Sequence, residues 1–310
     1  MNGPSPSPLR RRLRLLARGL GALILAALVA WGALALALDA ESRLLAAGFV
    51  LISLALLVGA RASRIRRLAW LALFALLLTW WFRLEPRNDR SWQAESARLP
   101  GARVEGERIT FTAVRDFDWS GEDEGLERWG ERSFALSDVR GVDLLTCDWG
   151  APAIVHTILS FELADGSQLA FSVETRREQG ESYSAVRGLY RQFELYYVVA
   201  SERDLLGVRA GFRGERLRLY PLVMEPEVAQ ELLLQYARRI EELGTQPAWY
   251  HAVSASCTSS IRRHALELGV AGPWNWRLLA NAHVDALLLE NGRIASPLPL
   301  AELRTRHDVT

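Results

Sequence analysis

Apolar runs and alternating positions divide this chain into two parts. Three runs without a charged residue lie at residues 19–38, 44–60 and 68–82. The first has twenty residues, which is enough to cross about 30 Å of hydrocarbon at about 1.5 Å per residue. The others are shorter, but tryptophans near both ends of the third suit a membrane interface. The pattern predicts a membrane anchor of three transmembrane helices in residues 1–84; a cleaved signal peptide is the alternative for the first run.

Arginines flank these runs unevenly. Five lie at residues 10–18, before the first run, and four lie at residues 61–67, between the second and third. The loop at residues 39–43 is nearly neutral. The positive-inside rule therefore places the N-terminus and the second loop in the cytoplasm. Three crossings then carry everything after Phe82 to the periplasm, so we expect a multi-pass inner-membrane protein with a periplasmic soluble domain.

After the apolar runs the chain is typical of a soluble α+β protein. Residues 85–107 are polar and predict a juxtamembrane linker, and residues 108–310 are long enough for one domain with a sizeable core. Strand-like alternation and one strongly amphipathic segment define its elements. The predicted strands are residues 108–115, 138–145, 156–163, 168–175, 194–200 and 217–223, and the predicted helices are residues 226–243, 258–268 and 276–290.

The clearest hairpin joins residues 156–163 to residues 168–175 through the turn Ala164-Asp165-Gly166-Ser167. Apolar residues take the odd-numbered positions in both strands, so the even-numbered positions share the opposite face. A three-residue loop sets His156 directly across from Glu174. A carboxylate at that distance orients an imidazole.

Charge separates the two parts of the chain. Residues 1–84 carry eleven arginines and two acids, whereas the remainder carries twenty-six arginines and thirty-four acids, a net charge of −8. An acidic domain repels polyanions, so a nucleic-acid partner is not expected. The chain has no lysine, which excludes lysine Schiff-base chemistry. Histidine and cysteine spacings predict no metal site, and the lack of a glycine-rich phosphate loop predicts no cofactor.

Cys257 lies where a helix is expected to begin, after Ser254 and Ser256. Backbone N–H groups and the helix dipole at such a position favour the thiolate, and the same N–H groups suit an oxyanion. Together with His156, this thiol suggests acyl chemistry on a substrate held by the membrane. His251, six residues upstream, is an alternative base.

The alternative for Cys257 is a disulfide with Cys147, which would abolish nucleophilic chemistry. Two oxidisable thiols in a periplasmic domain leave both possibilities open.

The segment from Cys147 to Asp204, followed by WYHAVSASCTSSI, carries the order WG, HT, ETRxE, RQxEL and C. Over residues 90–310 the chain resembles the periplasmic domain of the Lnb-type bacterial lipoprotein N-acyltransferases, formerly a domain of unknown function. The resemblance implies a circularly permuted papain-like (NlpC/P60-like) fold, with Cys257 as nucleophile and His156 as its base. Many relatives have two asparagines before the cysteine, where this chain has Ala255-Ser256.

The resemblance also implies two substrates, a membrane phospholipid and a lipoprotein. The thiolate would attack a phospholipid ester to form a thioester, and the α-amine of a lipoprotein cysteine would then take the acyl chain. Glu174 is the residue expected to orient His156. The candidates for binding a phosphate headgroup are Arg176, Arg177, Arg187 and Arg191, with pairing to nearby glutamates as the alternative.

Two other classes of function stay open from the sequence. One is a papain-like hydrolase of the cell envelope, a peptidase or amidase that needs a water-accessible groove. The other is a non-catalytic envelope assembly module with a vestigial or disulfide-bonded cysteine. A reactive Cys257 thiol is expected for the acyltransferase and for the hydrolase, but not for the assembly module. The sequence does not predict an oligomeric state.

Overall fold

The computed structural model describes residues 8–58 and 63–310. The chain divides into two compact units, Met1–Glu85 and Pro86–Thr310. The end of the second predicted span, residues 59–60, lies outside the described residues, as does Arg61.

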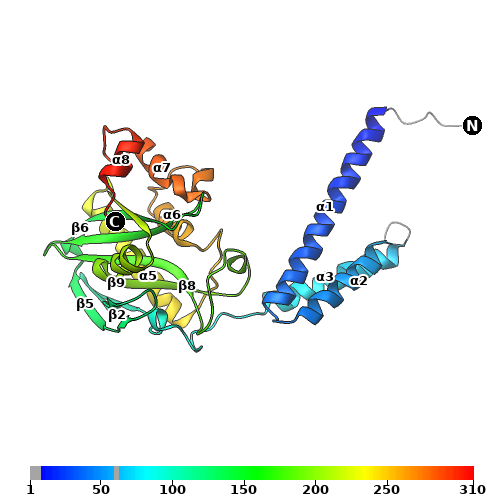
Figure 1. The fold of residues 1–310 in the computed structure, drawn as a ribbon, viewed down its shortest axis with the longest axis horizontal. Coiled ribbons are helices and arrows are strands. Elements are labelled where there is room, and N and C mark those ends of the chain that lie inside the picture. The colour runs from blue at the N-terminus through cyan, green and yellow to red at the C-terminus, as the bar shows by residue number, and fades with distance from the viewer. Residues whose placement is uncertain (1–7, 59–62) are drawn as a thin grey trace, which may run out of the picture. The chain divides into compact units, whose positions relative to one another are not determined.

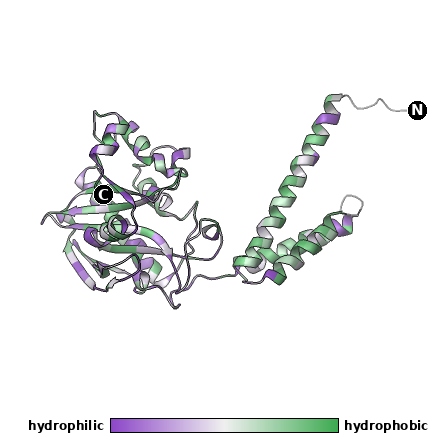
Figure 2. Cartoon of the chain, viewed as in Figure 1, coloured by the Kyte–Doolittle hydropathy of each residue, from purple (hydrophilic) through white to green (hydrophobic). Residues whose placement is uncertain are grey.

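The first unit consists of the helices α1 (Pro8–Leu38), α2 (Arg43–Val58) and α3 (Arg64–Phe82), which are hydrophobic along most of their length (Figures 1 and 2). By length and composition, α1 and α3 qualify as membrane spans, with mean hydropathies of 2.4 and 1.4. The helix α2 is apolar but has only 16 residues, or about 24 Å. Two of the three predicted spans are therefore supported, whereas the described part of the middle one, Arg43–Val58, is too short to qualify.

Close packing joins these three helices. Phe49 and Leu77 lie in one buried cluster with Val29 and Trp70. A Cβ added to Gly32 of α1 would lie 2.6 Å from Leu77 and 2.7 Å from Phe49. The missing side chain of Gly32 therefore lets α2 and α3 approach α1, as small residues do between membrane helices.

The second unit is built on one eight-stranded sheet in the order β1-β2-β9-β8-β7-β6-β10, with β5 also paired to β2. Its pairs are antiparallel except for β2 with β9. The strands are β1 (Gly101–Glu105), β2 (Arg108–Arg115), β5 (Trp129–Ala135), β6 (Val139–Asp148), β7 (His156–Leu163), β8 (Gln168–Arg176), β9 (Glu194–Ser201) and β10 (Arg216–Pro221), and a separate pair is β3 (Asp118–Trp119) with β4 (Gly125–Leu126).

Helices cover both faces of this sheet (Figure 1). On one face Tyr236 of α5 packs against Phe161, Phe171 and Tyr197. On the other face Leu205 of α4 packs against the alternate residues of the same strands. The helices are α4 (Glu202–Gly207), α5 (Pro226–Thr245), α6 (Cys257–Glu267), α7 (Val284–Glu290) and α8 (Leu300–Arg306).

The predicted α+β class and the predicted core strands are confirmed, but two expectations are wrong. Residues 85–107 are not a free linker, because strand β1 joins the sheet at β2 and Trp92 is buried against the residues around Glu178. The predicted helix at residues 276–290 is broken into two 3₁₀ turns and the short α7. The break coincides with Asn281, whose side chain is buried and bonds elsewhere in the fold.

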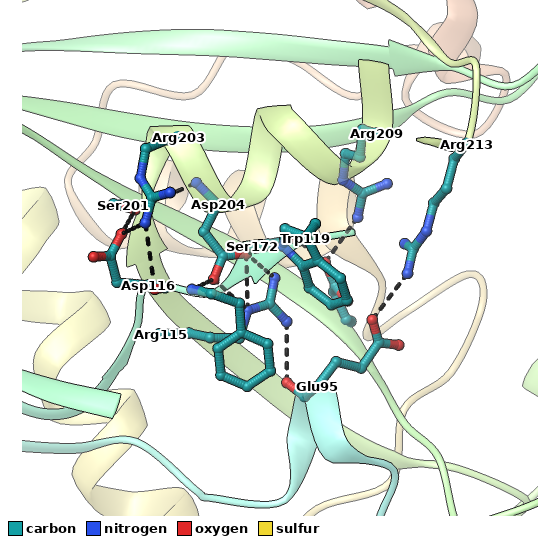
Figure 3. A network of polar contacts seen from close by, with 12 residues as sticks. Glu95, Arg115, Asp116, Trp119, Ser172, Ser201, Arg203, Asp204, Arg209 and Arg213 are labelled. Carbon is teal, nitrogen blue, oxygen red and sulfur yellow. Dashed lines mark hydrogen bonds and ion pairs between the residues drawn. The ribbon is translucent and has the colours of Figure 1, made fainter. Parts of the chain in front are cut away.

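A buried ion pair holds α4 to the sheet (Figure 3). Asp204 is fully buried and accepts hydrogen bonds from Arg115, from the Phe117 backbone at 2.7 Å and from the Trp119 indole at 3.0 Å. The Arg115 guanidinium, equally buried, also donates to the Glu95 carbonyl at 3.0 Å. Each buried charge is thus compensated, which is the condition for keeping it in the interior.

We expect Asp204→Ala to lower the free energy of unfolding by about 3–5 kcal/mol, because it leaves the Arg115 charge buried without a partner. Asp118→Ala is the control: it breaks surface ion pairs with Arg128 and Arg203, which are worth about 0–1 kcal/mol. Thermal unfolding of the full-length protein in detergent measures both variants. Equal losses in the two would contradict the importance of the buried pair.

Candidate functional site

The hairpin of β7 and β8 sets the position of His156. Its register pairs Ile158 with Ser172 and Leu159 with Phe171. The same register, continued to the first residue of β7, places His156 opposite Glu174. The alignment predicted from the alternation of the two strands is therefore confirmed.

Ser172 lies between the side chains of His156 and Glu174. The alternation of the strand predicts that Ser172 shares their face of the sheet, but it predicts no role for this residue. Its hydroxyl donates to Glu174 Oε1 at 2.6 Å and lies 2.6 Å from His156 Nε2. The direct distance from Nε2 to Glu174 Oε1 is 3.6 Å. Because the hydroxyl proton goes to the carboxylate, Ser172 Oγ accepts from Nε2–H. This arrangement fixes the tautomer and leaves Nδ1 of His156 as the base.

Arg209 supports the carboxylate from the other side. It lies in a π-helical turn, Val208–Phe212, and donates to Glu174 at 2.9 Å and to Glu215 at 3.1 Å. Figure 3 shows Arg209 near Arg213, which reaches Glu95. Burial raises the pKa of Glu174, but the polar contact with His156 and the charge of Arg209 outweigh it and hold that pKa well below its usual range. Glu174 is therefore a carboxylate.

Cys257 is the first residue of α6, with Ser256 as the N-cap. The Ser256 backbone donates to Ser259 Oγ at 2.7 Å, which closes the helix start. Burial raises the pKa of the Cys257 thiol, but the charge of His156 and hydrogen bonds with His156 and Thr157 lower it to about 6 overall. The structure therefore brings the predicted thiol and imidazole together, with the thiol ionised near neutrality.

The His156 pKa shifts in the opposite direction. Burial and the charge of Arg209 lower it, whereas the Cys257 thiolate, the hydrogen bond with Cys257 and the polar contact with Glu174 raise it to about 9 overall. Both shifts favour the thiolate–imidazolium pair at neutral pH. The two groups titrate as a coupled pair.

Asn281 ties the two halves of the site together. Its side chain accepts from the Val155 backbone at 2.9 Å and donates to the Val155 carbonyl at 2.7 Å and to Thr258 Oγ1 at 2.6 Å. It thereby connects the residue before His156 to the residue after Cys257. An asparagine inside the apolar stretch at residues 276–290 was the only sequence signal for it.

A cavity of about 410 Å³ opens onto the site. His156 and Cys257 lie in its wall together with Arg209 and Arg213. Its other walls combine aromatic and aliphatic side chains with polar and acidic ones, among them the exposed Glu122 and Asp123. Several of the apolar side chains are about half exposed: Trp149, Ile154, Tyr183, Val253 and Leu279. A volume of this size fits an organic ligand.

The four predicted headgroup arginines behave differently from one another. Arg176 is buried and donates to the Ser96 and Ala97 carbonyls, so the expectation of a binding role for it is wrong. Arg187 pairs with Glu181, the alternative envisaged from the sequence.

Arg177 lies in the cavity wall and pairs with Glu95, which also binds Arg213. Arg191 lies just before β9, and no role follows from its position. Of the four, only Arg177 lines the cavity that contains the thiol.

The remaining alternatives for the cysteines and histidines are also resolved. Cys147 and Cys257 are both free thiols, and they belong to hydrophobic clusters on opposite faces of the sheet. Burial is the main reason that the pKa of Cys147 is raised to about 12. His251 Nδ1 accepts from the Ser254 backbone at 3.2 Å within its own turn. The imidazole that faces Cys257 is that of His156.

We predict that iodoacetamide alkylates Cys257 with a half-maximal rate near pH 6, because the imidazolium of His156 stabilises the thiolate. In His156→Ala that midpoint rises by two units or more, to roughly 8.5 or above. Mass spectrometry of tryptic peptides follows the reaction in the full-length protein. Cys147 is the internal control and stays unmodified over the same range.

Ser172→Ala tests the bridge between Glu174 and His156. Without the hydroxyl, the nearest approach of Nε2 to the carboxylate is 3.6 Å, which is too long for a hydrogen bond. We expect the alkylation midpoint to rise above that of the native protein while the thermal stability changes little. A midpoint identical to the native one would mean that Ser172 does not position the imidazole.

Comparison with known proteins identifies a family for this part of the chain. A family model described as the Lnb N-terminal periplasmic domain matches residues 125–283, about half of the chain. The match spans β7, β8 and α6 and so contains both His156 and Cys257. No curated protein and no solved structure matches the chain. The resemblance seen in the sequence is confirmed, and the chain belongs to the family of the Lnb N-terminal periplasmic domain.

Proposed function

We propose that this protein is a membrane-anchored thiol acyltransferase that moves an acyl chain from a phospholipid to the N-terminal amine of lipoproteins. The observation that carries the proposal is the Cys257–His156 pair, with the thiol pKa lowered to about 6 beside an oriented imidazole. Family membership and the two helices that qualify as membrane spans support a substrate in the cell envelope.

In the first half-reaction the Cys257 thiolate attacks the ester carbonyl of the phospholipid. The backbone N–H groups at the start of α6 stabilise the developing oxyanion. The imidazolium of His156 gives its Nδ1 proton to the departing glycerol oxygen, so the C–O bond breaks and a lysophospholipid leaves. The products are a thioester on Cys257 and a neutral imidazole.

In the second half-reaction the α-amine of a lipoprotein attacks the thioester. Neutral His156 takes a proton from the attacking nitrogen, the C–S bond breaks, and Cys257 leaves as the thiolate. The amide product carries the acyl chain, and the ion pair is restored. Glu174 and Ser172 position the ring in both half-reactions without changing their own protonation.

The order of the catalytic elements supports a circularly permuted papain-like fold. The histidine strand β7 precedes the cysteine helix α6, and α6 packs against β7 and β8. A nucleophile at a helix start that faces a histidine on a neighbouring strand is the geometry of thiol proteases and their relatives. We therefore assign the domain at residues 108–310 to this group, together with the segment at residues 86–107 that packs onto it.

The mouth of the cavity suits lipid substrates. Five of the apolar side chains that line it are 43–50 % exposed: Trp149, Ile154, Tyr183, Val253 and Leu279. Exposed apolar groups of this kind mark contact with a membrane or another apolar partner. A soluble peptide substrate would gain less from such a rim than a phospholipid does.

A periplasmic domain requires an odd number of crossings from a cytoplasmic N-terminus. We therefore propose that α2 crosses the membrane despite its 16 residues, helped by snorkelling of the flanking Arg43. A C-terminal alkaline phosphatase fusion is expected to be active, and deletion of Arg43–Val58 is expected to inactivate it by inverting the domain. An inactive fusion of the full chain would refute the topology.

We predict that Cys257→Ser abolishes N-acylation of lipoproteins in a strain that lacks any other N-acyltransferase, because the serine hydroxyl is not ionised by His156. Mass spectrometry of lipoprotein N-termini would then show a free amine in place of the amide. Cys147→Ser is the matched control and keeps the native pattern, since Cys147 lies on the opposite face of the sheet.

Unchanged N-acylation in Cys257→Ser would contradict the proposal. Altered peptidoglycan fragments with unchanged lipoproteins would instead assign the same thiol to an envelope hydrolase. A native thiol that no alkylating reagent modifies in the reduced protein would exclude both enzymes.

A further inference from the structure

A second cavity, of about 420 Å³, shares a wall with the cavity that contains the thiol. Thr258 and Leu278 line both cavities. Thr258 directly follows Cys257, and its hydroxyl is held by Asn281 at 2.6 Å and lies 3.3 Å from Thr157 Oγ1. The second cavity therefore begins one residue from the nucleophile.

Apolar side chains make up most of its walls. They come from the sheet, from α5, from α6 and from the C-terminal part of the unit, and include Leu159, Leu232, Ile261, Ala265, Leu287 and Leu288. Two arginines also line it, and Arg293 donates to the Val270 carbonyl at 2.9 Å. The cavity is thus apolar over most of its wall, and its two charged groups are Arg262 of α6 and Arg293 of the loop after α7.

We propose that this cavity binds the acyl chain that Cys257 carries, an inference that rests on the proposed function. An alkyl chain has no hydrogen-bonding groups, so it loses nothing by entering walls such as Leu159 and Ile261. A peptide in the same place would leave its backbone N–H and C=O groups without partners, which is costly. The volume also lies in the range of cavities that hold small organic ligands.

Because Thr258 and Leu278 line both cavities, an acyl chain attached to Cys257 in the first cavity needs to pass only these residues to enter the second. Thr258 is fixed by its hydrogen bonds, whereas Leu278 is half-buried at the end of a short 3₁₀ turn, Trp276–Leu278. The acyl chain therefore passes from the thioester carbonyl along Leu278 into the second cavity. Each methylene that enters favours binding by about fourfold.

The test compares Ala265→Phe with Ala301→Phe in the full-length protein in detergent. Ala265 lines the second cavity from α6, so a phenyl ring there takes up its volume. Ala301 is an exposed residue of α8 and receives the same substitution as a control.

The substrates are the p-nitrophenyl esters of acetate and palmitate. The Cys257 thiolate attacks the ester carbonyl, the C–O bond breaks, p-nitrophenolate leaves, and the gain in mass reports the thioester.

We expect Ala265→Phe to slow acylation by palmitate by about tenfold or more, while its acetate rate stays within about twofold of native. Ala301→Phe keeps both native rates. Palmitate partitions into detergent micelles, but it does so equally for all variants because the substrate and detergent are the same. A difference in rate between variants therefore comes from the protein. If Ala265→Phe melts at a lower temperature than the native protein, Val270→Phe fills the same cavity from the neighbouring loop.

The outcomes separate the two proposals. A native palmitate rate in a folded cavity variant would overturn the acyl-chain site and leave the acyltransferase proposal standing. Failure of acetate to acylate Cys257 in the native protein would overturn the proposed function itself. A palmitoyl chain with a terminal diazirine gives a second measurement: crosslinks to α6 or α7 support the site, and crosslinks confined to a second copy of the chain refute it.

Discussion

The register between β7 and β8 is the constraint on which the site and the core both depend. Odd-numbered residues such as Phe161 and Phe171 pack under α5, while the even-numbered Ser172 and Glu174 face His156. A slip of one residue would turn the aromatic rings to the face under α4 and place the charged groups under α5. The geometry of the site is therefore maintained by the hydrophobic free energy that folds the sheet.

Charges of opposite sign alternate through the buried part of the site. The Cys257 thiolate faces the His156 imidazolium, and the imidazolium lies near the Glu174 carboxylate. Glu174 pairs with Arg209, and Arg209 also pairs with Glu215. Each of these five groups has a neighbour of opposite charge, which offsets the free-energy cost of removing it from water. The same alternation explains why the thiol pKa falls to about 6 while the imidazole pKa rises to about 9.

Local patterns predicted much of this structure, and long-range contacts account for the rest. Alternation alone was enough to align His156 with Glu174, since register in a hairpin depends on nearby residues. Arg209 and Asn281 were not foreseen, because Arg209 acts on Glu174, 35 positions away, and Asn281 acts on Val155, 126 positions away. Arg176 was misassigned for the same reason: its carbonyl partners lie in a segment that looked like a linker.

The proposed transfer to an amine, in place of hydrolysis, requires that the thioester outlast its contact with water. Cys257 is only 8 % exposed, so a thioester formed on it would have little room for a water molecule beside its carbonyl. A neutral amine is also a better nucleophile than water at equal concentration. Burial of the thiol, an apolar mouth and a cavity for the chain then act in one direction: they favour the nucleophile that arrives with its own lipid anchor over the solvent.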